Sequence, residues 1–274
     1  AKSLGIENLS RSQVSSMAKE LDDQVEAFRN RPLSGSHYPV IWVDALYEKI
    51  RYDGHVVSMA IQVVCGVNEQ GTRDVLAIEP MFEESRESYT QLFGKLKERG
   101  LPMPSLVISD ANSGLVTAIQ QNFPGASWQR CKVHFMRNIL AKIPHRNKES
   151  FAAELKQIWL APNVEAARKR ADSLVEEYEK RFPEAIQILE DGLEDSLQFY
   201  SFPALDSRKI ASSNMLERLN KEIRRRTRVV GIFPNPASYV RLVATYLMEY
   251  TEDWSEARAY FSAESIQKAF PLAV

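Results

Sequence analysis

The strongest constraint on the fold is the change from helical to strand periodicity just after His37. Three segments rich in β-branched and apolar residues follow, at Val40–Tyr47, Val56–Val67 and Thr72–Met81. The turn-forming run Asn68-Glu69-Gln70-Gly71 separates the last two. Segments of this kind joined by turns predict antiparallel strands, so we expect a three-stranded meander.

Two helix-then-strand units follow the meander. Helical spacing over Ser88–Arg99 leads to a short strand at Ser105–Ser109, and a helix over Gly114–Phe123 leads to a strand at Ala126–Lys132. Three strands, helix, strand, helix, strand is the order of an α/β fold with a mixed five-stranded sheet and flanking helices. We therefore expect a ribonuclease H-like sheet, in which the later strands are added by crossover helices.

An all-helical insertion is predicted after His134, where the strand signals stop. Its later part is acidic, since Val164–Tyr200 contains ten acidic and five basic residues. Strand-like Gln198–Phe202 and Pro203 close the insertion. Ser212-Ser213-Asn214 then predicts the cap of a helix over residues 215–226.

The N-terminal residues predict two short helices, the first ending near Leu4–Ile6 and the second capped by Ser10 or Ser12. This pattern fits the end of a helix-turn-helix-like DNA-binding segment, and a plain helical hairpin fits it equally well. Residues 31–36 are typical of a linker. We expect four segments: 1–35, the N-terminal module and linker; 36–135, the first part of the core; 136–205, the insertion; and 206–274, the second part of the core.

Composition excludes several classes of protein. Two cysteines and four histidines leave little for a disulfide framework or structural zinc. Nothing in the first thirty residues has the apolar core expected of a signal peptide, and no apolar run reaches the roughly 18 to 20 residues that span a bilayer. The formal charge of −1 gives no overall sign of a polyanion partner, so a nucleic-acid surface would need a local cluster of cations.

Two aspartates stand where strands would otherwise be apolar. Asp44 interrupts a strand that is expected to be buried, and a buried carboxylate is costly unless it is paired or bound to a cation. The alternative is an edge strand with Asp44 facing water. Asp110 directly follows the predicted strand Ser105–Ser109. It therefore lies at the carboxyl end of a strand, where ligand-binding sites of such sheets usually lie. An aspartate in that place can also be a turn residue or a helix cap.

Glu217 lies on a helix with two contrasting faces. Leu216, Leu219 and Ile223 form an apolar stripe, basic residues lie on the opposite side, and Glu217 falls on the flank. From Glu217 to Arg228 there are six basic and two acidic residues. We expect this basic face to hold a DNA backbone; a solvated face with internal Glu–Arg pairs is the alternative. Its members are Arg218, Lys221, Arg224, Arg225, Arg226 and Arg228.

Two divalent cations beside a phosphodiester need carboxylate ligands. Such ligands are available at Asp44, Asp110 and Glu217. Two Mg²⁺ or Mn²⁺ ions can activate an attacking water or 3′-hydroxyl and stabilise the leaving oxygen. The carboxylates then need no unusual pKa for acid–base work, and we find no persuasive Ser-His or Cys-His pair.

Four ordered motifs resemble the Mutator-type transposases of bacterial insertion sequences. They are Trp42–Tyr47, Val107–Leu115, Trp128–Asn138 and Glu217–Asn235. The resemblance implies an Asp-Asp-Glu triad on a ribonuclease H-like fold with a helical insertion before the Glu, at Asp44, Asp110 and Glu217. Ala111 is a departure, because many relatives have Gly directly after the second Asp.

The same resemblance implies a DNA transposase that cleaves transposon ends and joins the freed 3′-hydroxyl to target DNA. Its partners would be terminal inverted repeats, target DNA and further copies of itself on paired ends, on the nucleoid of the bacterial cytoplasm and not at a membrane. A longer protein, with DNA-binding helices upstream of Ala1, is also implied. The alternatives are a catalytically idle or truncated DNA-binding regulator, a nuclease or resolvase of the same fold, and a protein-binding helical scaffold.

Cys131 and His134 match the Cys-x-x-His pattern of these transposases. A zinc site would need two more ligands, so we expect His134 near the active site or against DNA, or the two residues as a packing pair. Asn214 is also expected to lie near the active site. The four tryptophans, Trp42, Trp128, Trp159 and Trp254, are expected in the core.

Overall fold

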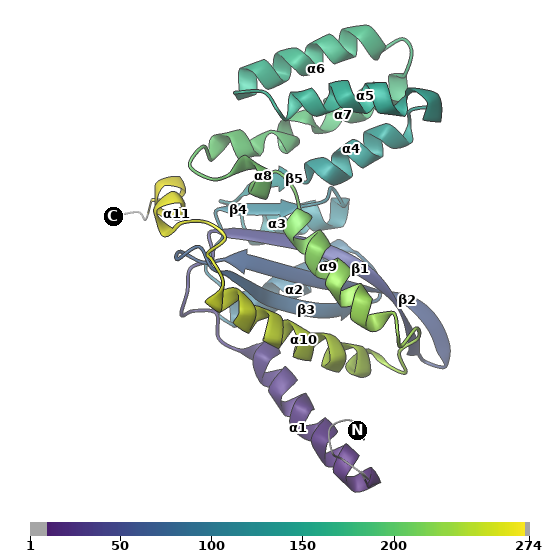
Figure 1. The fold of residues 1–274 in the computed structure, drawn as a ribbon, viewed down its shortest axis with the longest axis vertical. Helices are drawn as coiled ribbons and strands as arrows, with labels where there is room; N and C mark the ends of the chain where they lie inside the picture. The colour runs from purple at the N-terminus through teal and green to yellow at the C-terminus, as the bar shows by residue number, and fades with distance from the viewer. Residues whose placement is uncertain (1–9, 272–274) are drawn as a thin grey trace.

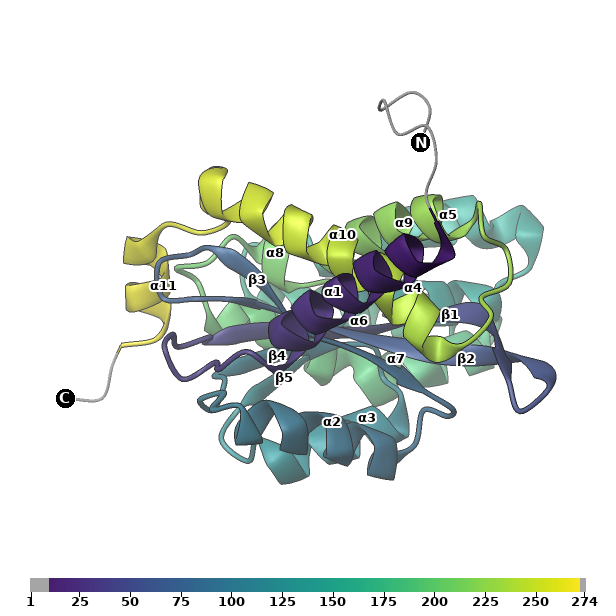
Figure 2. The same cartoon turned by 90° about the horizontal axis from the view of Figure 1, so that it is seen from below.

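The computed structural model describes residues 10–271 and contains a five-stranded mixed sheet with helices on both faces (Figures 1 and 2). The strand order is β3-β2-β1-β4-β5, with β1 in the centre. The first three strands pair antiparallel, and β4 and β5 run parallel to β1. The predicted meander and mixed sheet are therefore confirmed. The strands are β1 (Val40–Tyr52), β2 (His55–Val67), β3 (Arg73–Met81), β4 (Leu106–Ser109) and β5 (Ser127–Arg130).

Strand β1 is longer than predicted. It runs to Tyr52, which pairs with His55 across a two-residue turn, and not to Tyr47. Asp53 and Gly54 take positive φ angles of 47° and 77° in this turn. Such a turn matches the twist of a hairpin, so pairing continues to its tip despite the charged residues at the end of β1.

Successive residues of β1 point to opposite faces of the sheet. Ile41 and Val43 join the apolar cluster under α2 (Arg86–Glu98) and α3 (Ser113–Asn122). Trp42 and Leu46 join the cluster on the other face, which α9 (Asn214–Thr227) and α10 (Pro236–Glu256) cover (Figure 2). By this alternation Asp44 belongs to the face that α9 covers.

The segment after β5 is helical, as predicted (Figure 1). One part of the prediction is wrong: Gln198–Ser201 is a 3-10 turn, not a strand. The Gln129 side chain forms hydrogen bonds with the backbone near this turn: its Oε1 accepts from Phe199 N at 2.7 Å, and its Nε2 donates to Ser196 O at 2.9 Å. The helical elements are α4 (Lys132–Ala141), η2 (His145–Asn147), α5 (Lys148–Ile158), α6 (Val164–Tyr178), α7 (Pro183–Ser196), η3 (Gln198–Ser201) and α8 (Ser207–Ile210).

Helix α7 packs closely on the end of β5 at Gly192. A Cβ at this position would collide with the Arg130 guanidinium and lie 2.8 Å from Phe135 Cε2. Arg130 itself lies over the Phe135 ring, 4.1 Å from its centroid. The absence of a side chain at Gly192 therefore lets the inserted helices dock directly beside the sheet.

The N-terminal helix α1 (Arg11–Asn30) begins with a capping box formed by Ser10 and Gln13. This confirms the second of the two helices predicted there; the first lies outside the described residues. Helix α1 projects from the body and packs against α10, where Val25 is buried (Figure 1). The chain ends with α11 (Ala263–Ala269). Within residues 10–271, no helix is long and apolar enough to cross a membrane.

Candidate active site

Asp44, within β1, lies beside the carboxyl end of β4, where Asp110 follows the strand, and we call this region the carboxylate edge. Strands β1 and β4 pair with Trp42 opposite Ile108, and each Asp follows two positions later. Paired strands are about 4.8 Å apart, so the register makes the two aspartates neighbours. The edge-strand interpretation of Asp44 is wrong, because β1 is the central strand.

A tight turn follows Asp110. Asn112 N donates to Asp110 Oδ1 at 3.3 Å, and Asn112 Oδ1 accepts from Leu115 N at 3.1 Å. The residue that caps α3 is therefore Asn112, and not Asp110. Asp110 remains at the end of β4, facing the same edge as Asp44.

Glu217 reaches this edge from the first turn of α9. Trp42 Nε1 donates to Ser212 O at 3.3 Å, which ties the start of the helix to β1. The predicted apolar stripe of Leu216, Leu219 and Ile223 is buried against the sheet. One turn after Glu217, Asn220 Nδ2 donates to Asp44 Oδ2 at 3.0 Å. Three elements far apart in the sequence thus bring three carboxylates together.

The helix begins as predicted but is capped differently. Ser213 is the N-cap residue, yet its side chain caps no helical N–H. Its N and Oγ instead donate to Cys131 Sγ, at 3.3 Å and 3.2 Å. A tertiary contact between α9 and the end of β5 therefore replaces the local cap.

The electrostatics of the cluster are unfavourable to ionised Asp44. Burial raises the pKa of Asp44 to about 6, and repulsion from Asp110 and Glu217 adds to the rise, while attraction from His134 opposes it. Glu217 Oε1 is buried without a hydrogen-bond partner. Its nearest cations, His134 Nε2 at 3.7 Å and Arg137 Nη2 at 3.9 Å, are too distant for hydrogen bonds. The surrounding protein does not fully neutralise these carboxylates.

This donor set fits a divalent cation in its chemistry. Carboxylate and amide oxygens are the ligands that Mg²⁺ and Mn²⁺ prefer, and the orphaned Oε1 of Glu217 and Oδ1 of Asn220 are buried acceptors. Across residues 10–271, however, no group of three or more His, Cys, Asp or Glu side chains is placed so that it could hold a metal ion. The carboxylates are grouped around one edge without converging on one point.

Cys131 and His134 lie beside the cluster. Burial raises the pKa of the Cys131 thiol, but the adjacent His134 and the hydrogen bonds from Ser213 lower it by more, so the net shift is downward. Interaction with the adjacent Cys131 and charge attraction from Asp44 raise the pKa of His134 to about 9, against the opposing effect of burial. The pair therefore places positive charge 3.7 Å from Glu217.

The basic residues of α9 divide into two groups. Arg218, Lys221, Arg224 and Arg228 are exposed, as is Arg225, whose Nε also pairs with Glu222 at 3.0 Å. Arg226 lies over the Tyr246 ring of α10, 3.5 Å from its centroid, and pairs with Glu222 at 3.5 Å. Arg226 is thus partly engaged in packing. Asn214, the first helical residue, is exposed.

Two site neighbours were not singled out from the sequence. Asn220 lies on the buried face of α9. A polar residue on this otherwise apolar face, one turn after Glu217, is the sequence feature that could have pointed to it. Glu84 bridges the Asp110 turn, since its Oε1 accepts from Tyr47 Oη at 2.8 Å and its Oε2 accepts from Asn112 Nδ2 at 3.1 Å. Nothing in the sequence placed Glu84 beside Asp110.

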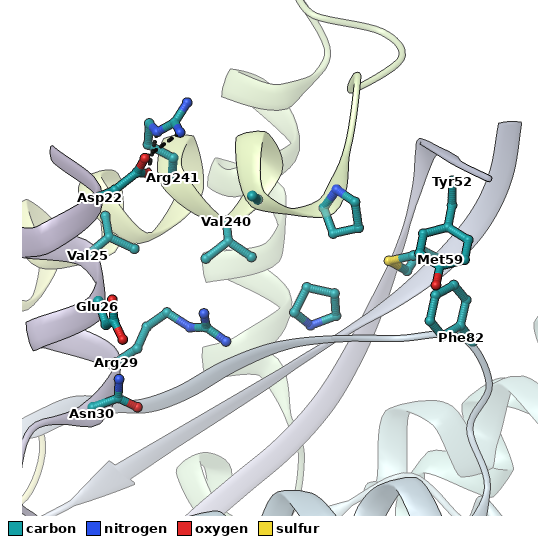
Figure 3. A pocket seen from close by; sticks show the side chains of 13 residues that line it. Asp22, Val25, Glu26, Arg29, Asn30, Tyr52, Met59, Phe82, Val240 and Arg241 are labelled. Carbon is teal, nitrogen blue, oxygen red and sulfur yellow. Dashed lines mark hydrogen bonds and ion pairs between the residues drawn. The ribbon is translucent and has the colours of Figure 1, made fainter. Parts of the chain in front are cut away.

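A cavity of about 460 Å³ lies elsewhere, between α1, α10 and the ends of β1 and β3 (Figure 3). Asp22 and Arg241 form a bidentate ion pair at its rim, with both contacts at 2.6 Å. None of the three carboxylates of the candidate site lines it. This cavity is therefore separate from the candidate site.

Comparison with known proteins identifies the family. Residues 1–257 match the model of the Mutator family of transposases. The chain belongs to the Mutator transposase family. It is 39% identical over 249 residues to the transposase of insertion sequence IS256 in transposon Tn4001 of Staphylococcus aureus, covering 90% of this chain and 64% of that protein.

Two other relatives have similar sequence identity and coverage. The IS1081 transposase of Mycobacterium tuberculosis is 40% identical over 268 residues, which are 98% of this chain and 65% of that protein. The ISRM5 transposase of Rhizobium meliloti is 37% identical over 265 residues, 97% of this chain and 66% of that protein. The chain thus spans slightly less than two thirds of the length of these relatives.

Proposed function

We propose that the chain is the catalytic part of an insertion-sequence transposase with a ribonuclease H-like core. The observation that carries this proposal is the grouping of Asp44, Asp110 and Glu217 from β1, the end of β4 and α9, with half-buried Asp44 repelled by the other two. Membership of the Mutator family supports the same activity. The helices between β5 and α9 then correspond to the insertion of such enzymes.

The reaction has two steps and leaves no covalent bond to the enzyme. Water attacks the phosphorus at a transposon end, and the 3′ oxygen leaves as a hydroxyl after taking a proton. That 3′-hydroxyl then attacks a phosphodiester of target DNA and displaces a second 3′ oxygen. The number of phosphodiester bonds is conserved in the second step, so it needs no cofactor that supplies energy.

Asp44, Asp110 and Glu217 would hold two Mg²⁺ or Mn²⁺ ions. When bound, these ions supply activation of the attacking oxygen and stabilisation of the leaving oxygen. Asn220 fixes the orientation of the Asp44 carboxylate through its 3.0 Å hydrogen bond. His134 and Arg137 hold Glu217 toward the edge and add positive charge where a phosphate would bind.

The substrate would be DNA, bound first through its backbone. Five exposed cations of α9 extend from the Glu217 turn along the helix: Arg218, Lys221, Arg224, Arg225 and Arg228. Contacts of this type position the duplex and make binding sensitive to salt, without reading much sequence. We further propose that two or more copies act together on paired transposon ends.

Cleavage and strand transfer on a duplex that carries the cognate transposon end, with Mg²⁺ or Mn²⁺, test this function. Asp44→Asn, Asp110→Asn and Glu217→Gln should each lower activity about a thousandfold or more, equivalent to about 4 kcal/mol. Glu48→Gln is a matched control, because Glu48 is a half-buried carboxylate on the same face of β1, bonded by Thr227 Oγ1 at 3.0 Å. Full activity in any of the three variants would overturn the triad. DNA binding by the parent protein without any cleavage would favour a catalytically idle regulator.

A further inference from the structure

The loop between α9 and α10 presents apolar side chains to solvent. Val229 is 87% exposed, Val230 43% and Ile232 42%. Grouped apolar side chains on a surface mark interaction sites more often than isolated ones do. We call residues 229–232 the tip loop.

The tip loop is held firmly at both ends. After it, Phe233 is buried, its N donates to Lys49 O at 3.0 Å, and its O accepts from Arg51 N at 2.8 Å. Before it, Val230 N and Gly231 N both donate to Thr227 O, at 3.0 Å and 3.3 Å. Gly231 turns the chain with a φ of 74°. The apolar residues are therefore displayed at a fixed position, and ordering them costs little when a ligand binds.

Cations surround the tip loop. Exposed basic residues come from the end of α9 and from the strand that Phe233 joins: Arg224, Arg225, Arg228, Lys49 and Arg51. Two acidic neighbours are already engaged, since Glu48 accepts from Thr227 Oγ1 and Glu222 pairs with two arginines. Asp53, at the hairpin tip, is an exposed acid on this side. An apolar tip ringed mainly by cations suits a ligand with a polyanionic exterior and an apolar interior, as duplex DNA has.

Helix α9 sets the distance between the tip loop and the carboxylates. Eleven residues separate Glu217 from Arg228, and at 1.5 Å per residue they span about 16 Å. Base pairs follow each other at about 3.4 Å along duplex DNA. A duplex aligned with α9 would therefore meet the tip loop about five base pairs from the phosphodiester at the carboxylate edge.

We propose that the tip loop is a wedge, and that Val229 and Ile232 enter the base stack about five base pairs from the reacting phosphodiester. This inference rests on the proposed function, because it requires DNA on the basic face of α9. Apolar side chains that insert between base steps unstack them and bend the duplex. The bend would direct the transposon end into the carboxylate edge.

Base unstacking can be measured with 2-aminopurine placed three to seven base pairs on either side of the cleavage position. The parent protein should raise the fluorescence most near the fifth base pair. The double variant Val229→Ser/Ile232→Ser should lose most of this signal, and its cleavage of fully paired DNA should fall about tenfold. A mismatch at that position should restore cleavage to within about twofold, because unstacking is then already complete. Leu160→Ser is the matched control, since Leu160 is 57% exposed in the turn that follows α5, away from the tip loop.

The outcomes separate the wedge from the proposed function. Unchanged fluorescence and cleavage in the double variant would overturn the wedge alone. A change in sedimentation of the double variant, with unchanged fluorescence, would instead assign the tip loop to a contact between copies and also overturn the wedge. Unstacking by the parent protein without cleavage would support the wedge and overturn the catalytic function. Absence of DNA binding by the parent protein would overturn both.

Discussion

The helices between β5 and α9 (the insertion) and the carboxylate edge of the sheet both contain acidic residues. The pKa values of these acids shift in opposite directions in the two regions. In the insertion, Glu184 pairs with Lys142 at 2.8 Å and Glu194 with Arg168 at 2.7 Å, and these hydrogen bonds lower the pKa of both glutamates. At the edge, burial and like charges raise the pKa of Asp44 to about 6.

This difference separates acids that are neutralised by partners on a surface from acids that the surrounding protein leaves partly uncompensated. Exposed pairs such as Glu194 with Arg168 contribute little to stability and titrate normally or more acidically. Buried carboxylates that repel one another cost folding free energy, and clusters of that kind concentrate at functional sites. The formal charge of −1 describes neither region, because it sums an acidic insertion and a basic helix.

The largest expected effect comes from removing an amide that contacts a carboxylate in each region. Asn220→Leu deletes the hydrogen bond to Asp44 and should lower the cleavage rate about 10- to 100-fold, with a higher Mg²⁺ concentration at half-maximal rate. Gln187→Leu deletes an equivalent bond to Asp191 on exposed α7 and should change neither quantity by more than about twofold. Equal effects of the two substitutions on Mg²⁺ dependence would remove the distinction between the regions.

The second effect is on stability without divalent cations. Asp44→Asn removes a half-buried, poorly solvated charge and should raise the free energy of unfolding by about 1–3 kcal/mol at pH 7, measured by urea denaturation in EDTA. Glu194→Gln removes an exposed pair and should change it by less than about 0.5 kcal/mol. A loss of stability in Asp44→Asn would show that the local environment favours the ionised carboxylate.

The pH dependence of this stability follows from the raised pKa. Between about pH 4 and 6 the folded protein keeps a proton on Asp44 that the unfolded chain releases, so the ionised group destabilises the fold as pH rises. The stability difference between the parent protein and Asp44→Asn should be near zero below pH 4, widen up to about pH 6 and stay constant above it. A constant difference from pH 4 to 8 would contradict the raised pKa.

The smallest effect concerns single cations. Arg228→Ala should reduce the slope of log affinity for DNA against log salt by about one, the value for one lost phosphate contact. Arg225→Ala should have a smaller effect, because Arg225 is also paired with Glu222. Arg168→Ala, in the insertion, should leave the slope unchanged. Equal slopes for the parent and Arg228→Ala would remove α9 from the DNA surface.

Periodicity predicted the sheet because its determinants are local. Alternating apolar residues and the Asn68–Gly71 turn specify strands and their order, so the meander and both helix–strand units follow from short segments. The predicted strand at residues 198–202 is wrong because Gln129, which is distant in sequence, forms hydrogen bonds with the backbone of Ser196 and Phe199. The charged residues within 48–51 argue against a strand, whereas the Asp53–Gly54 turn extends the pairing of β1 through them to Tyr52.

The site was predictable to a different degree. Asp44, Asp110 and Glu217 could be chosen as chemically unusual or motif-bearing positions, and the structure places them at one edge. Asn220 carried only the weak signal of a polar residue on an apolar face, and Arg137 and Glu84 carried none, because their roles depend on how α4 and the loop after β3 dock. Local sequence specifies which groups are available, whereas tertiary packing decides which of them meet.

Sulfur substitution at the scissile phosphate tests most directly the claim that the carboxylate edge holds catalytic metal ions. Transposon-end DNA with a single phosphorothioate diastereomer would be cleaved by the parent protein in Mg²⁺ and in Mn²⁺. Mg²⁺ binds sulfur poorly and Mn²⁺ tolerates it better, so cleavage of one diastereomer should be suppressed in Mg²⁺ and restored in Mn²⁺. Equal suppression of both diastereomers in both ions, or no suppression at all, would contradict direct contact between the metal ions and the reacting phosphate.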